Sequence, residues 1–224
     1  MSVTEKEVDG SKGLKIVDQD FGFLKATNRV VIIGAAGTGK SVVMHYIAEG
    51  LHAQGAKVNM LAPHAIFELK KKGKIPGWLH LISYKYPVFE SNALTLYDDA
   101  QLRSHAREYY KHRNITLTKV LSIARHKKAG IIITTQTANE IDRDILQKMD
   151  YLIIKQPNFF AARMDRPEVR KLELEVLEAY QKDIIGKGLN PQEYSYVIST
   201  SGATWEGFVG PTGTPSYWTS ELGD

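Results

Sequence analysis

The sequence predicts an α/β fold in which an open, mostly parallel β-sheet is flanked by helices and ends in a C-terminal β-hairpin. Short apolar runs alternate with helical stretches along the 224 residues, which is the pattern of consecutive βαβ units. A glycine-rich loop follows the first clear strand and leads directly into a helix. Near the end, a Ser-Gly pair at 201–202 separates two strand-like runs, 194–199 and 204–209, and this arrangement indicates the hairpin.

The individual elements follow from runs of apolar or β-branched residues and from the residues that interrupt them. Strands are expected at the apolar runs 30–33, 57–61, 94–97, 131–135 and 151–154. The run 79–82 could form a further strand, although Pro76 and Pro87 interrupt its surroundings. Helices are expected at 40–53, 64–72, 100–112, 116–128 and from Pro167 onward. A capping box at 137–140 predicts one more helix, running to about Met149.

Composition excludes several kinds of protein. The chain has no cysteine, which rules out disulfides, zinc ribbons and thiol nucleophiles. No apolar run approaches the roughly 20 residues that a membrane-spanning helix needs, and the N-terminal segment lacks the apolar core of a secretory signal. We therefore expect a soluble, cytoplasmic protein. The net charge of +4 is small, but basic residues gather at 70–74 and 103–128, and either cluster could hold a phosphate backbone or be a solvated helix face.

The most specific signal in the chain is the octet at 34–41, Gly-Ala-Ala-Gly-Thr-Gly-Lys-Ser. It fits the Walker A pattern G-x-x-x-x-G-K-S/T and stands between a predicted strand and a predicted helix, as that motif requires. We expect backbone conformations that side chains disfavour at Gly34, Gly37 and Gly39. The loop N–H groups would surround phosphate oxygens, Lys40 would reach the β- and γ-phosphates, and Ser41 would offer its hydroxyl to Mg²⁺. The predicted nucleotide contacts are Gly34, Ala35, Ala36, Gly37, Thr38, Gly39, Lys40, Ser41 and Val42.

Polar residues that follow two other apolar strands complete a predicted ATP site. Asp98 and Asp99 come directly after the run 94–97, which places an acid at the carboxyl edge of the sheet beside the loop. Asp98 is the predicted Mg²⁺ ligand and Asp99 the predicted general base. The alternative is an aspartate that merely caps the next helix. Gln136 follows the run 131–135, where its amide can bond both the γ-phosphate and the attacking water.

Together these motifs resemble the FtsK-HerA superfamily of DNA-pumping ATPases, and most of all its small viral genome-packaging members. The resemblance covers residues 28–156. It is carried by the Walker A octet, the acid pair, the basic segment Ala-Arg-His-Lys-Lys-Ala-Gly (124–130), the strand that ends in Gln136, and the runs 141–146 and 150–154. It implies a RecA-like P-loop NTPase fold that uses ATP and Mg²⁺ to move double-stranded DNA into a capsid. The chain departs from the family in having Asp99 where a glutamate is usual, which changes the reach of the base to its water.

The resemblance also implies an assembly. Members usually form hexameric rings with the ATP site at a subunit boundary, where an arginine from the neighbour stabilises the transferring phosphoryl group. Arg125 is the predicted arginine, with Arg143 and Arg163 as alternatives. DNA would thread the central pore, to which the lysines of 70–74 could contribute. Further implied partners are other copies of the chain and capsid or portal-vertex proteins, in the host cytoplasm or the virion.

These expectations divide the chain into an N-terminal arm (1–27), a P-loop ATPase domain (28–210) and a C-terminal tail (211–224). The predicted catalytic residues are Lys40, Asp99, Gln136 and Arg125, and the predicted metal ligands are Ser41 and Asp98.

Two other functions use the same Walker A core and stay open at this point. A small-molecule P-loop kinase would carry an arginine-bearing lid, for which Arg163, Arg166 and Arg170 are available, although the strand ending in Gln136 weighs against it. A phage assembly ATPase of the Zot type would be expected to have a membrane anchor, and none is apparent. A GTPase switch is set aside because no Asn-Lys-x-Asp motif occurs.

Overall fold

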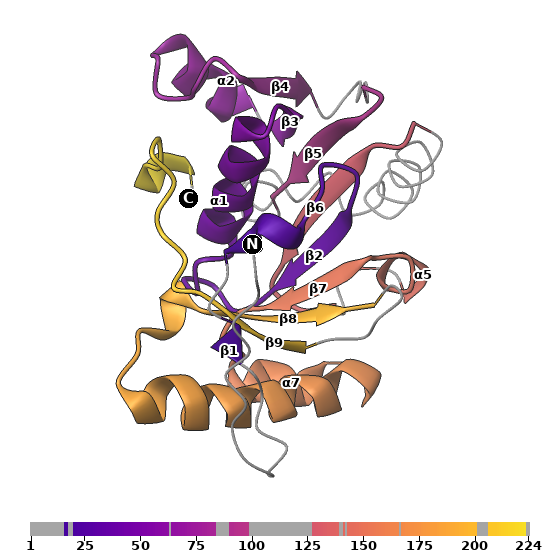
Figure 1. Ribbon diagram of the computed structural model, residues 1–224, viewed down its shortest axis with the longest axis vertical. Coiled ribbons are helices and arrows are strands. Elements are labelled where there is room, and N and C mark those ends of the chain that lie inside the picture. The colour runs from indigo at the N-terminus through magenta and orange to yellow at the C-terminus, as the bar shows by residue number, and fades with distance from the viewer. Residues whose placement is uncertain are drawn as a thin grey trace, which may run out of the picture.

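The computed structural model describes residues 16–17, 20–62, 64–83, 90–98, 127–138, 141, 143–165, 167–200 and 206–222. Within these ranges, nine strands form one sheet in the spatial order β1-β9-β8-β7-β2-β6-β5-β3-β4 (Figure 1). The strands are β1 (Ile16–Val17), β2 (Arg29–Ile33), β3 (Lys57–Ala62), β4 (Leu79–Ser83), β5 (Ala93–Tyr97), β6 (Gly130–Thr135), β7 (Tyr151–Ile154), β8 (Ser195–Ser199) and β9 (Glu206–Val209).

The central strands of this sheet are parallel, from β7 through β2, β6, β5 and β3 to β4. Among the described strands only β8 runs against its neighbours, because it pairs with β9 in the predicted hairpin and with β7 on its other side. The short strand β1 extends the β9 edge. The prediction of an open, mostly parallel sheet with a C-terminal hairpin is therefore confirmed, and the ambiguous run 79–82 is part of β4.

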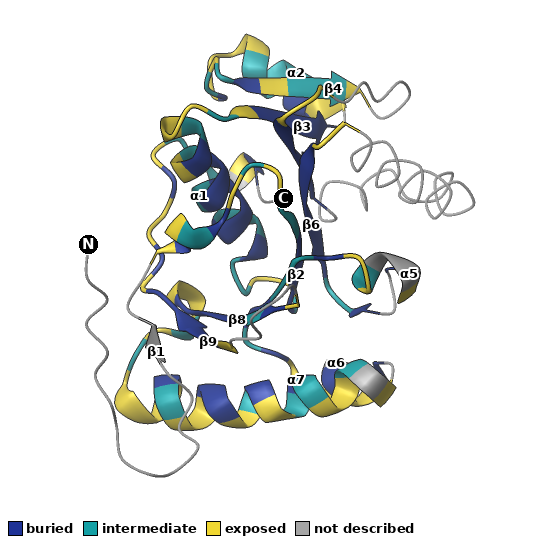
Figure 2. Ribbon diagram, turned by 45° about the vertical axis from the view of Figure 1, so that its right-hand side comes forward, coloured by how far each residue is buried: buried dark blue, intermediate teal, exposed yellow. Residues whose placement is uncertain are grey.

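Helices cover both faces of the sheet (Figure 2). α1 (Lys40–Ala53) and α2 (His64–Lys71) pack on one face, and α5 (Arg143–Leu146), α6 (Phe159–Met164) and α7 (Pro167–Ala179) lie on the other. Single 3₁₀ or π turns are η1 (Phe21–Phe23), η3 (Tyr180–Ile184), η4 (Ile185–Lys187), η5 (Pro191–Glu193) and η6 (Ser220–Leu222). None of the described helices is both long enough and apolar enough to cross a membrane.

Apolar side chains are buried on both faces of the sheet, which explains why the central strands are continuous apolar runs. In β2, Val30 and Ile32 pack into the core beneath α1, whereas Val31 and Ile33 pack into the core on the opposite face. All four side chains are at most 1% exposed, as expected of a parallel strand covered on both sides. Three residues outside the predicted domain limits also pack into the core beneath α1, namely Phe21, Leu24 and Leu222.

The helix predicted from the capping box at 137–140 is wrong in extent. Among the described residues of this segment, Ala138 begins a 3₁₀ turn, Ile141 lies in a bend, the α-helix is confined to Arg143–Leu146, and residues 147–148 form a turn. The backbone N–H of Ala138 donates to the Asp165 carboxylate at 2.7 Å, and the carbonyl of Thr137 accepts from the Thr135 hydroxyl at 3.0 Å. The capping box therefore marks the start of a helical turn, but not a continuous helix that runs to Met149. The two helices predicted within 100–128 lie outside the described residues, apart from 127–128.

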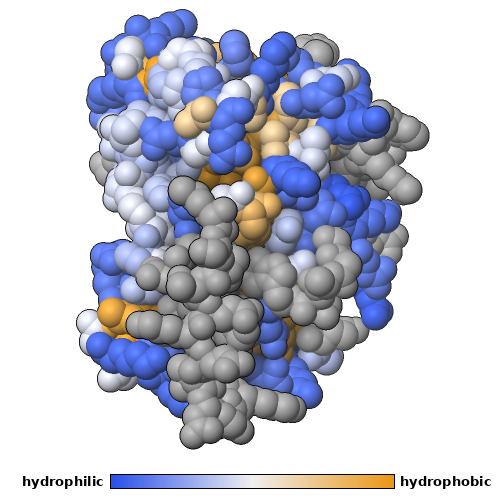
Figure 3. Space-filling view, in the orientation of Figure 1, coloured by the Kyte–Doolittle hydropathy of each residue, from blue (hydrophilic) through white to orange (hydrophobic). Residues whose placement is uncertain are grey.

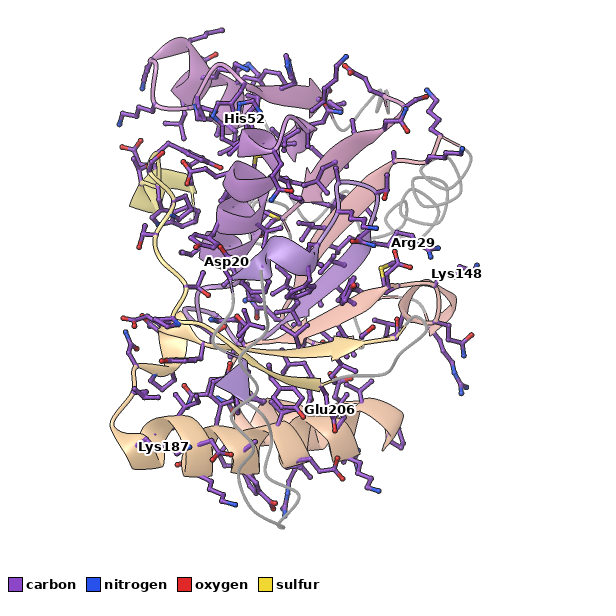
Figure 4. The ribbon with its side chains drawn as sticks, viewed as in Figure 1. Asp20, Arg29, His52, Lys148, Lys187 and Glu206 are labelled. Atoms are coloured by element: carbon purple, nitrogen blue, oxygen red, sulfur yellow. The ribbon has the colours of Figure 1, made fainter. Side chains whose placement is uncertain are left out.

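Parallel strands bring their carboxyl ends to one edge of the sheet, and that edge carries the predicted site. β2 continues there into the Walker A loop, β5 into Asp98 and β6 into Gln136. The opposite edge begins with Arg29, labelled in Figure 4, whose guanidinium pairs with Asp150 at 2.7 Å. The sheet order places β6 between β2 and β5.

Candidate nucleotide-binding site

The Walker A loop, residues 34–41 and hereafter the P-loop, has the conformation that the motif requires at two of its three glycines. Gly37 and Gly39 have φ values of 76° and 86°, which side chains disfavour. Gly34 is needed for a different reason than predicted, since its φ is not positive. A Cβ atom on Gly34 would lie 2.7 Å from Lys155 Cβ and 2.8 Å from Thr38 Oγ1, so any side chain would collide there.

The start of α1 supplies donors to the concave side of the P-loop. Gly39 is the N-cap residue, and Val43 N–H makes the first intrahelical bond to its carbonyl at 3.0 Å. The N–H groups of Lys40, Ser41 and Val42 therefore have no acceptor within the helix, and they stand at the positive end of its dipole. Lys40 is 8% exposed, and its Nζ donates to the Ala35 carbonyl at 2.9 Å. This cluster of donors suits a polyphosphate.

Asp98 lies at the same sheet edge, with β6 between its strand and the strand that leads into the P-loop. Its side chain is fully buried, and the Thr134 hydroxyl donates to its Oδ1 at 2.6 Å. The intervening strand β6 links Asp98 to the P-loop, because Gly34 N–H donates to the carbonyl of the next residue, Thr135, at 3.2 Å. Strands lie about 4.8 Å apart, so β5 and β2 are separated by about 10 Å across the sheet.

Gln136 follows Thr135 directly and is half-buried at the end of the intervening strand. It therefore stands between the strand that leads into the P-loop and the strand that leads into Asp98. Any phosphate held by the P-loop and any metal held near Asp98 would have this amide between them. The register of β6 against both neighbours fixes that position.

The residues present fit a magnesium ion bound together with a nucleotide. Ser41 offers a hydroxyl at the start of α1 and Asp98 a carboxylate at the end of β5, and hard oxygen donors of this kind are what Mg²⁺ prefers. The other predicted site residues, Asp99 and Arg125, lie outside the described residues.

His45 is a buried neighbour of this site that the sequence did not single out. It follows Ser41 by one helical turn, is fully buried, and its Nδ1 lies 2.8 Å from the Tyr217 hydroxyl. Burial lowers the pKa of His45 to about 4, and the Asp98 carboxylate opposes that shift. The imidazole is therefore neutral at neutral pH. Tyr217 and Trp218 both pack against this ring, which gives the C-terminal tail a structural role.

Lys155 is a second buried residue that sequence reasoning missed. It follows β7 at the carboxyl edge, is fully buried, and has three oxygen atoms within 3.4 Å of its Nζ. Burial lowers the pKa of Lys155 to about 7, whereas the oxygen acceptors favour the charged ammonium. A polar residue directly after an apolar strand was the available signal, and it is the same signal that identified Gln136.

Two carboxylates, those of Asp165 and Glu173, are buried, and the first of them supports the turn after Gln136. Asp165, which is 3% exposed, accepts the N–H of Ala138, and Arg170 donates to the Asp165 carbonyl at 3.2 Å. Glu173 lies on the buried face of α7 at 5% exposure. Its Oε2 has no hydrogen-bond partner among the described residues. Burial, and secondarily the charge of Asp165, raises the pKa of Glu173 to about 7.

This raised pKa predicts how stability changes with pH. Between pH 4.5, the ordinary pKa of glutamate, and about 7, the folded chain binds a proton at Glu173 that the unfolded chain does not. The free energy of unfolding should therefore fall as pH rises through this window. Glu173→Gln removes the effect, so thermal melts at pH 5 and pH 8 should show the variant gaining several °C over wild type only at pH 8. Glu178→Gln, an exposed change on the same helix, is the control; an equal gain at both pH values would contradict the prediction.

The lysines at 70–74, considered for DNA contact, are largely engaged within the chain. Lys70 donates to a backbone carbonyl of β4 at 2.5 Å. Lys71 pairs with Glu68 at 2.7 Å, and Lys74 pairs with Glu221 at 2.6 Å. These contacts reduce the charge that this cluster offers to a phosphate backbone. Figure 3 shows a mainly hydrophilic surface around it.

The structure describes three of the alternative arginines, of which Arg163 and Arg170 were considered for a kinase lid and Arg143 and Arg163 for the arginine that acts on a neighbouring subunit. Arg163 lies on α6 with its guanidinium carbon 4.6 Å from the centroid of the Phe159 ring. Arg170 is bonded to Asp165 within its own segment. Arg143 starts α5, which precedes β7 and so lies toward the sheet edge opposite the P-loop. Arg166 lies outside the described residues.

Comparison with known proteins identifies the fold through solved structures. No protein-family model matches the sequence, and no curated protein matches it. The DNA-packaging ATPase B204 of Sulfolobus turreted icosahedral virus superposes with a TM-score of 0.52 at 18% identity, covering 83% of this chain and 98% of that one. B204 of Sulfolobus turreted icosahedral virus 2, in complex with ATP-gammaS, gives a TM-score of 0.54 at 13% identity and covers 83% and 97%.

A third solved structure comes from a conjugation system. The pCW3 coupling protein TcpA, with ATPgS, has a TM-score of 0.52 at 15% identity, and the match covers 88% of this chain and 66% of that one. At these identities the likeness concerns the fold. The chain therefore shares the P-loop NTPase fold of viral genome-packaging ATPases and a conjugation coupling protein, which is the fold that the resemblance in its sequence predicted.

Proposed function

We propose that this chain is an ATPase that pumps double-stranded DNA, most specifically a viral genome into its capsid. The observation that carries the proposal is the meeting of P-loop, Gln136 and Asp98 at one sheet edge. That meeting rests on two hydrogen bonds of β6, one from Gly34 to Thr135 and one from Thr134 to Asp98. The fold shared with B204 and TcpA supports the DNA-pumping part of the proposal.

In the proposed reaction each residue acts on a different part of the triphosphate. The P-loop amides and the start of α1 hold the phosphate oxygens, and Lys40 neutralises charge that develops between the β- and γ-phosphates. Gln136 orients the attacking water against the γ-phosphate, and Asp99 accepts its proton. Ser41 and Asp98 would hold Mg²⁺, which neutralises phosphate charge when bound.

Movement of DNA needs a device that senses phosphate release, and β6 is suited to that task. The strand carries Gln136 at its end. Along its length it pairs with β2, which leads into the P-loop, and with β5, which leads into Asp98. A change of hydrogen bonding at Gln136 when phosphate leaves would shift the turn at 137–138. Asp165 connects that turn to the helices on the other face. We propose that this route couples hydrolysis to motion in a ring of subunits. The resemblance to the FtsK-HerA superfamily favours a hexameric ring.

The test is the ATPase rate of the purified chain with and without duplex DNA, with particle size measured alongside. We expect DNA to stimulate hydrolysis in a ring-sized particle, without any small-molecule phosphate acceptor. Transfer of the γ-phosphate to a small acceptor by a monomer would instead support the kinase alternative.

Arg125→Ala should separate nucleotide binding from hydrolysis in the assembled form. The proposed arginine acts on the neighbouring subunit's nucleotide, so the monomer should bind ATP normally while turnover in the ring falls by at least about 10²-fold. Binding is measured on the isolated monomer and turnover on the size-selected ring. Lys127→Ala, a neighbouring basic residue that is exposed, is the control. Wild-type turnover in the Arg125 variant would move the role to Arg143 or Arg163.

A further inference from the structure

Lys155 lies directly behind the P-loop without belonging to the motif. Its backbone N–H donates to the Ile33 carbonyl at 2.8 Å, which fixes it next to the last residue before the loop. Its side chain then passes against Gly34, where only a glycine leaves it room. Its Cε also lies 3.8 Å from the place a Cβ would take on Gly39. The lysine stem therefore follows the back of the loop from its first glycine to its last.

The ammonium group of Lys155 ends on the turn before β8, residues 190–194, hereafter the β8 turn, and beside the first residue of β8. Nζ donates to the carbonyls of Gln192 at 2.8 Å and Tyr194 at 2.6 Å, and lies 3.4 Å from Ser195 Oγ. The Tyr194 carbonyl also accepts the Tyr180 hydroxyl at 2.8 Å. The buried cation thereby ties the end of β7 to a segment nearly forty positions later in the chain.

The β8 turn also contacts the P-loop directly. Gln192 Nε2 donates to the Gly37 carbonyl at 3.1 Å. The turn is itself ordered by Asn190, whose side chain accepts the Gln192 N–H at 3.2 Å. Gly37 is the exposed glycine at the tip of the loop, with φ of 76°. The peptide that follows Gly37 has another backbone bond, a long one of 3.4 Å from Thr38 N–H to the Ala35 carbonyl, and glycine itself has little conformational preference.

We propose that Lys155 and Gln192 form a bracket that holds the P-loop in its phosphate-binding conformation before nucleotide arrives, with Lys155 as a positioning residue. Lys155 fixes the Gln192 backbone, and the Gln192 side chain fixes Gly37. This inference rests on the proposed function for its nucleotide readout, but the bracket itself is a property of the free protein.

The bracket has a kinetic consequence that distinguishes it from a merely structural contact. When only a fraction of the protein is competent to bind, the apparent dissociation constant rises by the inverse of that fraction. Once ATP is bound, the phosphates themselves hold the loop, so the rate at saturation is kept. Loss of the bracket therefore raises KM and Kd while kcat stays unchanged. General destabilisation would instead lower the active fraction, and with it kcat, without changing KM.

The experiment compares Gln192→Ala, Lys155→Met and the double variant with wild type, using Mg-ATP as the probe. Gln192 is exposed, so its variant should fold normally even if the buried Lys155 variant does not. We expect Gln192→Ala to weaken ATP binding about 2- to 10-fold, the effect of one neutral hydrogen bond. Lys155→Met should weaken it about 10- to 100-fold, because a charged donor is lost. The double variant should be no weaker than Lys155→Met, since both residues act through the same turn.

Gln181→Ala, an exposed glutamine after α7, is the matched control and should leave ATP binding unchanged. Hydrogen exchange of the peptide 34–41 without nucleotide gives a second readout, in which both bracket variants should exchange faster than wild type. Failure of wild type to bind Mg-ATP would overturn the proposed function, and the exchange data would still decide on the bracket. Unchanged Kd and unchanged exchange in both variants, or a fall in kcat at constant KM, would overturn the bracket.

Discussion

Lys40→Ala is expected to abolish ATP turnover, lowering kcat by at least about 10²-fold. Lys40 is the only P-loop residue with a positive side chain, and its stem is buried so that the ammonium faces the loop. No other loop residue can neutralise the charge that gathers between the β- and γ-phosphates when their bond breaks. The measurement is steady-state phosphate release at saturating Mg-ATP.

The fold should survive this change, which makes the result interpretable. Lys40 Nζ donates to the Ala35 carbonyl, and without Lys40 that carbonyl keeps the Thr38 hydroxyl as a donor at 2.8 Å. The melting temperature of the variant should therefore lie close to that of wild type. Lys187→Ala is the control, because this lysine lies beyond α7 and pairs only with nearby Asp183 in the described structure (Figure 4). Substantial hydrolysis by a folded Lys40 variant would refute the site.

Local signals predicted the nucleotide-binding half of the fold closely. The helix expected at 40–53 is found as α1 with the same limits, and the strand expected at 151–154 is found as β7. Both depend on interactions between near neighbours in the chain, namely the glycine turn before α1 and the β-branched run in β7. Their boundaries could therefore be taken from composition and spacing alone.

The parts that could not be predicted depend on strand order. Sequence spacing does not reveal that β6 inserts between β2 and β5. The same insertion lets Thr134 bond Asp98 and brings Thr135 to Gly34. The packing of β7 against β2 likewise brings Lys155 to Gly34, which converts a glycine expected for its φ into one needed for space.

Local signals also predicted one helix start but not its length. The capping box at 137–140 marks a 3₁₀ turn that begins at Ala138, but Ile141 lies in a bend and, among the described residues of this segment, α-helix is found only at Arg143–Leu146. The N–H of Ala138 donates to Asp165, twenty-seven positions away, and such a charge-assisted bond is stronger than a bond between neutral groups. This contact fixes the residues after Gln136, which is consistent with their proposed place in coupling.

Asp99→Asn is expected to stop hydrolysis, by about 10²- to 10⁴-fold, while leaving nucleotide binding intact. The neighbouring Asp98 is held rigidly, fully buried and bonded by Thr134, which suits a group that organises a metal. In the proposed reaction, the task of accepting a proton from water falls to the adjacent carboxylate. An asparagine there keeps the size and polarity of the side chain but cannot take up the proton. Mg-ATP affinity by titration and single-turnover hydrolysis measure the two effects separately.

Asp99→Glu tests whether reach or basicity sets the rate. Both side chains are carboxylates with similar ordinary pKa values, so a glutamate changes mainly the distance to the water by one methylene. If Asp99 is the base, Asp99→Glu should retain hydrolysis far better than Asp99→Asn at equal ATP occupancy. Asp98→Asn should behave differently again, by raising the Mg²⁺ concentration needed for half-maximal rate. Unchanged turnover in Asp99→Asn would assign proton acceptance to another group, because the asparagine has removed the only basic atom at that position.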